Sequence, residues 1–151
     1  MTDVRIRSGA LVLTADGNRA RLLRNKGTAL HVELATELEL RQENPPTREQ
    51  GTDKPGRAPG ADGVSRGAIE QTDWHRIAEE RFVADIAGRL YQMAHARTFD
   101  DLIVVAPPKV LGNLRAAFHP EVTARVLAEV AKDLSGLAPV EVARLLSHAG
   151  R

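Results

Sequence analysis

An unbroken apolar run, Leu102–Ala106, constrains the fold of this chain more than any other stretch. It is rich in β-branched residues, which is typical of a strand covered on both faces. Pro107 and Pro108 follow at once and end the strand, because proline donates no backbone N–H and restricts the residue before it. A helix is predicted over Lys109–Arg115. The step from a buried strand to a helix N-terminus often carries ligand contacts, and a plain connection between two elements is the equal alternative.

Composition excludes several classes of function. The 151 residues are enough for one core, and we expect residues 1–151 to form a single domain. The formal net charge of +1 gives no general attraction to nucleic acid or to an anionic membrane. Aromatic residues make up only 3%, which argues against a stacking platform for single strands, and the absence of cysteine excludes thiol chemistry. No apolar leader or bilayer-length stretch is present, so we expect a cytoplasmic protein without membrane insertion.

Three strands are expected in the first third of the chain, joined as an antiparallel meander. Asp16-Gly17-Asn18 is a strong turn signal between the first two strands. In the second strand, alternation places Arg19 and Arg21 on one face. The third strand alternates apolar and charged residues, which predicts one buried and one solvated face. The expected strands are Gly9–Ala15, Arg19–Arg24 and Leu30–Arg41.

The stretch Glu43–Gln71 differs from the rest of the chain. It holds four prolines, five glycines and almost no large apolar residue. Such a segment cannot bury enough surface to order itself, so we predict a long loop without regular structure. Gly56 and Gly60 would let the backbone approach a partner closely, and Arg57 between them is suited to pair with phosphate or carboxylate. A flexible linker is the alternative interpretation.

A long amphipathic helix is predicted after this loop. From a cap at Thr72 or Asp73, apolar residues recur at every fourth position, and the helix runs to about Arg97. The stretch Glu121–Leu134 fits either a helix or a strand. A final helix is predicted over Val140–His148, after a proline suited to its first position.

No pattern of catalytic or metal-binding residues stands out in the sequence. The five histidines lack the i, i+4 spacing of a zinc helix. Asp16, Asp100 and Asp101 are better explained as turn and cap residues than as catalytic carboxylates. We therefore predict no catalytic residue, no metal and no cofactor.

Several motifs resemble those of the bacterial host attachment proteins and occur in the same order. They are Ala15–Leu23, Pro55-Gly56-Arg57, Glu79–Phe82, Ala106–Arg115 and Lys132-Asp133-Leu134. This family is named for attachment of bacteria to host cells. Its fold is similar to the RNase H-like middle domain of archaeal and eukaryotic peptide-chain release factors. The resemblance implies an α/β fold with a five-stranded mixed sheet flanked by helices, a short helix near Glu121–Arg125 and a strand near Val126–Ala131.

The release-factor domain carries a Gly-Gly-Gln tripeptide in the loop after its meander, which promotes peptidyl-tRNA hydrolysis. At that place this chain has Pro55–Gly60, and Gly-Gly-Gln is absent from the sequence. The resemblance therefore does not imply hydrolysis by that route.

Two functions follow from these observations, with a hydrolase as a distant third. The first is a non-enzymatic binding protein of the host attachment family that supports attachment indirectly. The second is a factor associated with the ribosome or tRNA, so the expected partner is an unknown protein, the ribosome or tRNA. We predict one anion-binding surface formed by Arg57, Lys109 and Arg115. The full set of predicted contact residues is Gly56, Arg57, Gly60, Pro107, Pro108, Lys109, Arg115, Arg19 and Arg21.

Overall fold

The computed structural model describes residues 4–42 and 60–147, with the side chains of 4–42 and 74–147. Its strands are β1 (Leu11–Ala15), β2 (Arg19–Asn25), β3 (Leu34–Arg41), β4 (Leu102–Val105) and β5 (Val126–Val130). Its helices are α2 (Gly60–His95), α3 (Pro108–Ala117), α4 (Pro120–Thr123) and α5 (Pro139–Ser147). The sheet order is β3-β2-β1-β4-β5, with antiparallel pairing in the meander and parallel pairing of β1, β4 and β5. The predicted five-stranded mixed sheet flanked by helices is confirmed.

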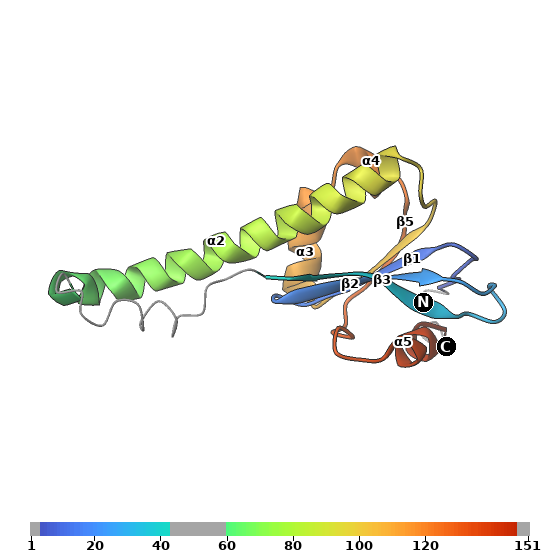
Figure 1. The fold of residues 1–151 in the computed structure, drawn as a ribbon, viewed down its shortest axis with the longest axis horizontal. Coiled ribbons are helices and arrows are strands. Elements are labelled where there is room, and N and C mark those ends of the chain that lie inside the picture. Colours follow the sequence, from blue (N-terminus) through green and yellow to red (C-terminus); the bar gives the residue numbers. More distant parts are fainter. Residues whose placement is uncertain (1–3, 43–59, 148–151) are drawn as a thin grey trace.

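The sheet separates two hydrophobic clusters. Helices α2, α3 and α4 lie on one face and α5 lies on the other, as Figure 1 shows. Alternate residues of β1 divide between them: Leu11 and Leu13 pack toward α2, whereas Val12 packs toward α5 and the segment that precedes β1. Because both faces are covered, the inner strands carry apolar side chains on both sides.

The central strand confirms the interpretation of the apolar run. Leu102 to Ala106 are all buried, and the side chain of Val104 is only 1% exposed. β4 lies between β1 and β5, so its backbone is paired on both sides. Pro107 then caps α3 and Pro108 is its first residue, one position before the predicted start.

The start of the long helix was predicted wrongly. α2 begins at Gly60, twelve residues before Thr72, so Gly60–Gln71 is helical and does not belong to a loop. No proline occurs between Pro59 and Pro107. A helix whose later turns are packed can extend backward at little cost, because nucleation is the expensive step. The remainder of the predicted loop, 43–59, lies outside the described residues.

The third strand starts later than predicted, at Leu34, and the side chain of Leu30 is 89% exposed. The chain between β2 and β3 is held by the buried side chain of Asn25. Its Nδ2 donates to the carbonyl oxygens of Ile6, Arg7 and Thr28, and its Oδ1 accepts from the amides of Gly27 and Glu33. This hydrogen bonding satisfies the backbone without strand pairing, so β3 starts four residues later than predicted.

The structure resolves the ambiguous stretch after α3. Its first part is the short helix α4, and its second part is β5, as the family resemblance implied. The final helix begins at Pro139, as predicted, and buries Ala143 and Leu146.

Candidate functional site: the carboxyl edge of the sheet

The parallel strands β1, β4 and β5 end at the same side of the sheet. The antiparallel strands bring the start of β2 and the end of β3 to this side as well. We call this side the carboxyl edge; it comprises Asp16–Arg19, Arg41–Gln42, Pro107–Lys109 and Lys132–Ser135. In open α/β sheets, ligands bind preferentially outside the carboxyl ends of the strands. Three predicted groups of contact residues, at Arg19, at the proline pair and at Lys109, meet at this edge.

Asp16 organises the turn at the carboxyl edge. Its Oδ1 accepts hydrogen bonds from the backbone amides of Asn18 (2.7 Å) and Arg19 (2.8 Å). Its Oδ2 lies 2.9 Å from the hydroxyl of Ser135, in the segment after β5. The same hydroxyl lies 2.7 Å from Oδ1 of Asp133. Asp16 therefore ties the first turn of the chain to its C-terminal part, and the turn role predicted for it is confirmed.

The ionised form of Asp16 is the one that these contacts favour. Burial alone would raise the pKa of its carboxyl group. The hydrogen bonds from the two amides and from Ser135, together with the nearby charge of Arg19, outweigh burial and lower that pKa below its ordinary value. Asp16 is thus a charged turn residue whose two oxygens are already occupied by donors within the protein.

Lys109 lies in the first turn of α3, at the carboxyl edge, and its side chain is exposed. It lines a small depression of about 30 Å³ with Asp16, Glu79 and Asn113. The first turn of α3 contains no acidic residue. Its free N–H groups and the helix dipole therefore add positive potential beside Lys109.

Arg21 does not form part of an exposed surface. Only 9% of the residue is exposed, and Nη2 donates to the carbonyl oxygen of Leu137 at 2.6 Å. Burial lowers the pKa of the guanidinium. The negative charge of Glu39 raises that pKa in part, and the positive charge of Arg19 lowers it further. Arg21 is a packing residue that holds the chain after β5 against the sheet. The prediction that it contacts a partner's phosphate is therefore wrong, since its donors face inward.

Arg115 lies in the last turn of α3, away from Lys109 in the first turn. Its guanidinium forms a two-pronged ion pair with Glu129 on β5, with distances of 2.6 and 3.2 Å. The hydrogen bonds and charge of Glu129 raise the pKa of Arg115. A side chain engaged in this way ties α3 to the edge strand. The structure thus separates two members of the predicted anion-binding surface.

The remaining predicted contact residues are only partly described. Gly56 and Arg57 lie outside the described residues, so the proposed meeting of Arg57 with Lys109 stays a prediction. Gly60 is the first residue of α2 and is not a loop residue. Pro107 and Pro108 begin α3, where they fix the direction in which the helix leaves the sheet.

Sequence reasoning did not place Arg41 at the carboxyl edge. It is the last residue of β3 and pairs directly with Arg19 across the sheet. The sequence did carry a signal, because two strands joined by a turn place an early residue of one opposite a late residue of the other. The register could not be deduced, however, since β3 starts late and a bulge shifts the pairing between Leu22 and Leu23.

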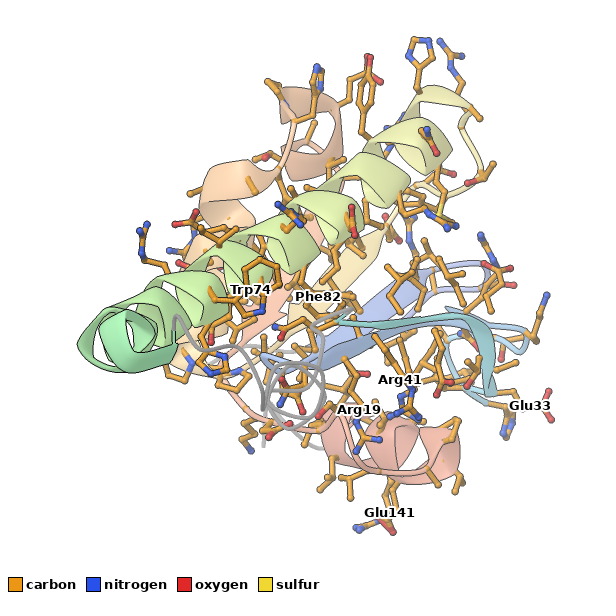
Figure 2. The ribbon with its side chains drawn as sticks, turned by 60° about the vertical axis from the view of Figure 1, so that its left-hand side comes forward. Arg19, Glu33, Arg41, Trp74, Phe82 and Glu141 are labelled. Carbon is orange, nitrogen blue, oxygen red and sulfur yellow. The ribbon has the colours of Figure 1, made fainter. Side chains whose placement is uncertain are left out.

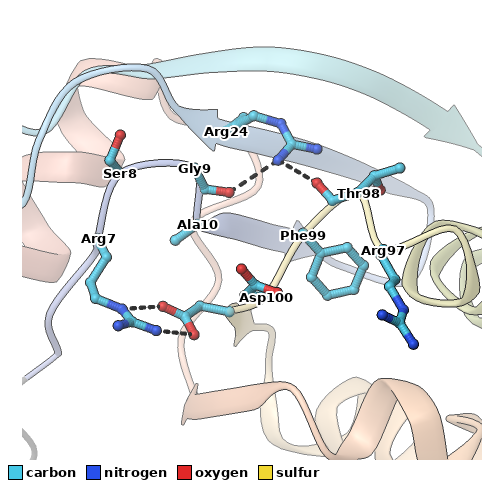
Figure 3. Close-up of a pocket in the computed structure, with 10 residues that line it drawn as sticks. Arg7, Ser8, Gly9, Ala10, Arg24, Arg97, Thr98, Phe99 and Asp100 are labelled. Atoms are coloured by element: carbon cyan, nitrogen blue, oxygen red, sulfur yellow. Dashed lines mark hydrogen bonds and ion pairs between the residues drawn. The ribbon is translucent and has the colours of Figure 1, made fainter.

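A pocket of about 400 Å³ lies at the opposite edge of the sheet (Figure 3). Arg7 pairs with both carboxylate oxygens of Asp101, at 2.7 and 2.9 Å. Arg24 donates to Glu37 and to the carbonyl oxygens of Gly9 and Thr98. These bonds fasten the segment before β1 to the start of β4 and to the end of α2. The charged side chains around this pocket bind one another and the backbone of the same chain. The carboxyl edge is therefore the stronger candidate for a ligand-binding site.

Within the described residues, no three His, Asp or Glu side chains come together in a way that could hold a metal ion. In the same part of the chain, none of the helices combines the length and the hydropathy of a membrane span.

The comparisons with known proteins agree with this architecture. The family model for the bacterial archaeo-eukaryotic release factor family 12 matches residues 9–146, from just before β1 into α5. Among curated proteins, none matches the chain significantly. The release-factor part of the resemblance is thereby confirmed, and the host-attachment part is not. Since the match covers most of its length, the chain belongs to bacterial archaeo-eukaryotic release factor family 12.

Proposed function

We propose that this protein is a ribosome- or tRNA-associated factor that binds without catalysing Gly-Gly-Gln-type hydrolysis. The observation that carries the proposal is the match of a release-factor family model to residues 9–146. The carboxyl edge supports it, because exposed cations and the N-terminus of α3 lie there and suit an RNA backbone. The sequence lacks Gly-Gly-Gln, so the proposed activity is binding. A factor of this kind works in the cytoplasm, which we propose as its location.

The proposal is tested by sedimentation of the purified chain with purified ribosomes and by fluorescence anisotropy with deacylated tRNA. We expect association with at least one of these at 50 mM salt and progressive loss as salt rises, because phosphate contacts release counterions. A peptidyl-tRNA hydrolysis assay should show no turnover above background. Failure to bind ribosomes and tRNA at low salt would contradict the proposal.

A role in attachment of bacteria to host cells is the second candidate. It is supported by the motif Ala106–Arg115 and its companions, which resemble those of the host attachment proteins. A deletion strain distinguishes the two candidates. If attachment falls while ribosome profiles and translation rates stay normal, the attachment role is favoured; if translation changes first, the ribosome-associated role is favoured.

A further inference from the structure

Arg19 and Arg41 form a pair of like charges across two neighbouring strands. They are direct partners in the register of β2 and β3. Directly opposed residues of an antiparallel pair point to the same face, with Cβ atoms about 4.5–5.5 Å apart. Figure 2 shows the two side chains next to each other on the α5 side of the sheet. Arg41 is exposed and Arg19 is half-buried.

Neither guanidinium has an ion-pair or hydrogen-bond partner among the described residues. Five other arginines among the described residues each pair with a carboxylate. The pairs are Arg7–Asp101, Arg24–Glu37, Arg76–Glu80, Arg115–Glu129 and Arg144–Glu141. Like charges directly opposite each other destabilise a sheet, so the repulsion between Arg19 and Arg41 opposes the pairing of β2 with β3 at this point.

Among the described residues, the nearest acids form no ion pair with either guanidinium. Both oxygens of Asp16 are taken by backbone amides and by Ser135, although its charge is felt by Arg19. Glu39 is the cross-strand partner of Arg21, whose charge it faces. Among the described residues, no side chain takes up the donors of the two guanidiniums, which leaves these donors for a ligand.

The geometry points to a site for the phosphodiester backbone of RNA at the pair Arg19–Arg41, which deepens and rests on the proposed function. Each guanidinium presents a planar fork of N–H donors that matches two phosphate oxygens. A phosphate between the two removes their mutual repulsion and gains charge-assisted hydrogen bonds. On one side the guanidinium of Arg19 packs against Gly136, where a Cβ would lie 3.1 Å from Nη2, so a ligand reaches Arg19 from the side of Arg41.

The contact is to the backbone and not to the bases. Phosphate contacts fix position without reading sequence, whereas base readout in single strands needs aromatic stacking platforms. Aromatic residues make up only 3% of this chain. The site should thus bind RNA of unrelated sequences with similar affinity.

The test compares the full chain with the double variant Arg19→Ala/Arg41→Ala. A matched control, Arg5→Ala/Lys26→Ala, removes two exposed charges next to the far end of β2. The probes are an unstructured RNA 12-mer, purified ribosomes and polyglutamate, each titrated from 50 to 200 mM salt. For the 12-mer, the slope of log K against log salt should fall by about 1.4 in the test variant, because two phosphate contacts at about 0.7 each are lost. The control should keep the parent slope.

The outcomes separate the site from the function. If binding of the 12-mer depends on the arginine pair but the parent protein binds neither ribosomes nor tRNA, the site is supported and the proposed function fails. If ribosomes bind equally to the parent and to both double variants, the function stands and the site is refuted. Equal loss in the test and control variants also refutes the site, as does binding of polyglutamate as tight as that of RNA. If no RNA binds the parent, both fall.

A stability measurement gives a second, independent readout. Arg41→Glu replaces the repulsion by an attractive cross-strand pair with Arg19, so the melting temperature should rise while affinity for the 12-mer falls at least tenfold. A purely structural role for Arg41 predicts instead that stability and binding fall together. That result would overturn the assignment.

Discussion

Replacing Asp16 by alanine should loosen the carboxyl edge in a pH-dependent way. The change removes the acceptor for the amides of Asn18 and Arg19, whereas the single hydroxyl proton of Ser135 still reaches Asp133. A hydrogen bond to a charged group contributes about 1.5–3 kcal/mol, but the exposed Asn18 amide regains water, so about 2–3 kcal/mol is expected in all. For a domain of this size, that corresponds to a fall in melting temperature of about 5–10 °C.

The pH dependence follows from the direction of the pKa shift of Asp16. Its folded-state pKa lies below the ordinary value, so the ionised carboxylate stabilises the fold above the unfolded-state pKa of about 3.9. That contribution is lost as the pH falls through the lower, folded-state value. The difference in unfolding free energy between parent and Asp16→Ala should therefore be constant from pH 7 to about pH 5 and shrink below about pH 4.

Urea denaturation followed by circular dichroism, at intervals from pH 7 to pH 2.5, measures this difference. Asp100→Ala is the control, because Asp100 is exposed at the opposite edge and its loss should change stability by less than about 0.5 kcal/mol. A loss at pH 7 as small as that of the control would refute the role given to Asp16. A difference that stays constant down to pH 2.5 would refute its electrostatic origin.

Three further substitutions test other parts of the fold. Val104→Asp should prevent cooperative folding, since an unpaired buried carboxylate costs several kcal/mol and the whole free energy of unfolding is about 5–15 kcal/mol. The control is Val140→Asp, which should melt near the parent temperature because Val140 is 74% exposed. Gly27→Ala should destabilise by about 1–3 kcal/mol, because the new Cβ meets the carbonyl oxygen of His31; Gly112→Ala in α3 meets nothing and should stabilise by about 0.5–1 kcal/mol. Arg97→Gly should stabilise the protein by about 0.5–1 kcal/mol and so raise the midpoint of urea denaturation, because Arg97, two residues after α2, has φ 60°, which glycine adopts freely.

The central strand and the long helix were predictable because one local signal determines each of them. A run of consecutive apolar residues fits a strand covered on both faces, and Val104 is buried accordingly. The four-residue recurrence from Phe82 to Ala94 marks the packed side of α2. The helix start at Gly60 was not predictable in the same way. Helix extension beyond the packed turns depends on cooperativity and leaves no apolar pattern.

The candidate site was only partly predictable because it depends on long-range contacts. The sequence of an alternating strand does not show whether an arginine side chain faces water or is covered by another segment of the chain. Arg21 is covered by residues more than 100 positions later, through its hydrogen bond to Leu137. Arg115 likewise finds Glu129 only once β5 lies beside β4. The meeting of Arg19 with Arg41 required the strand register, which a bulge in the pairing of β2 and β3 determines.

Ultraviolet crosslinking in living cells, followed by mass spectrometry of RNA-linked peptides, tests the central claim most directly. The tagged full chain is crosslinked, purified under denaturing conditions and digested, and the nucleotide-bearing residues are mapped. We expect ribosomal or transfer RNA on peptides of the carboxyl edge, around Arg19, Arg41 and Lys109, with loss of the first two signals in the Arg19→Ala/Arg41→Ala variant. Absence of crosslinked RNA, or crosslinks confined to the opposite edge around Arg7 and Arg97, would contradict the claim.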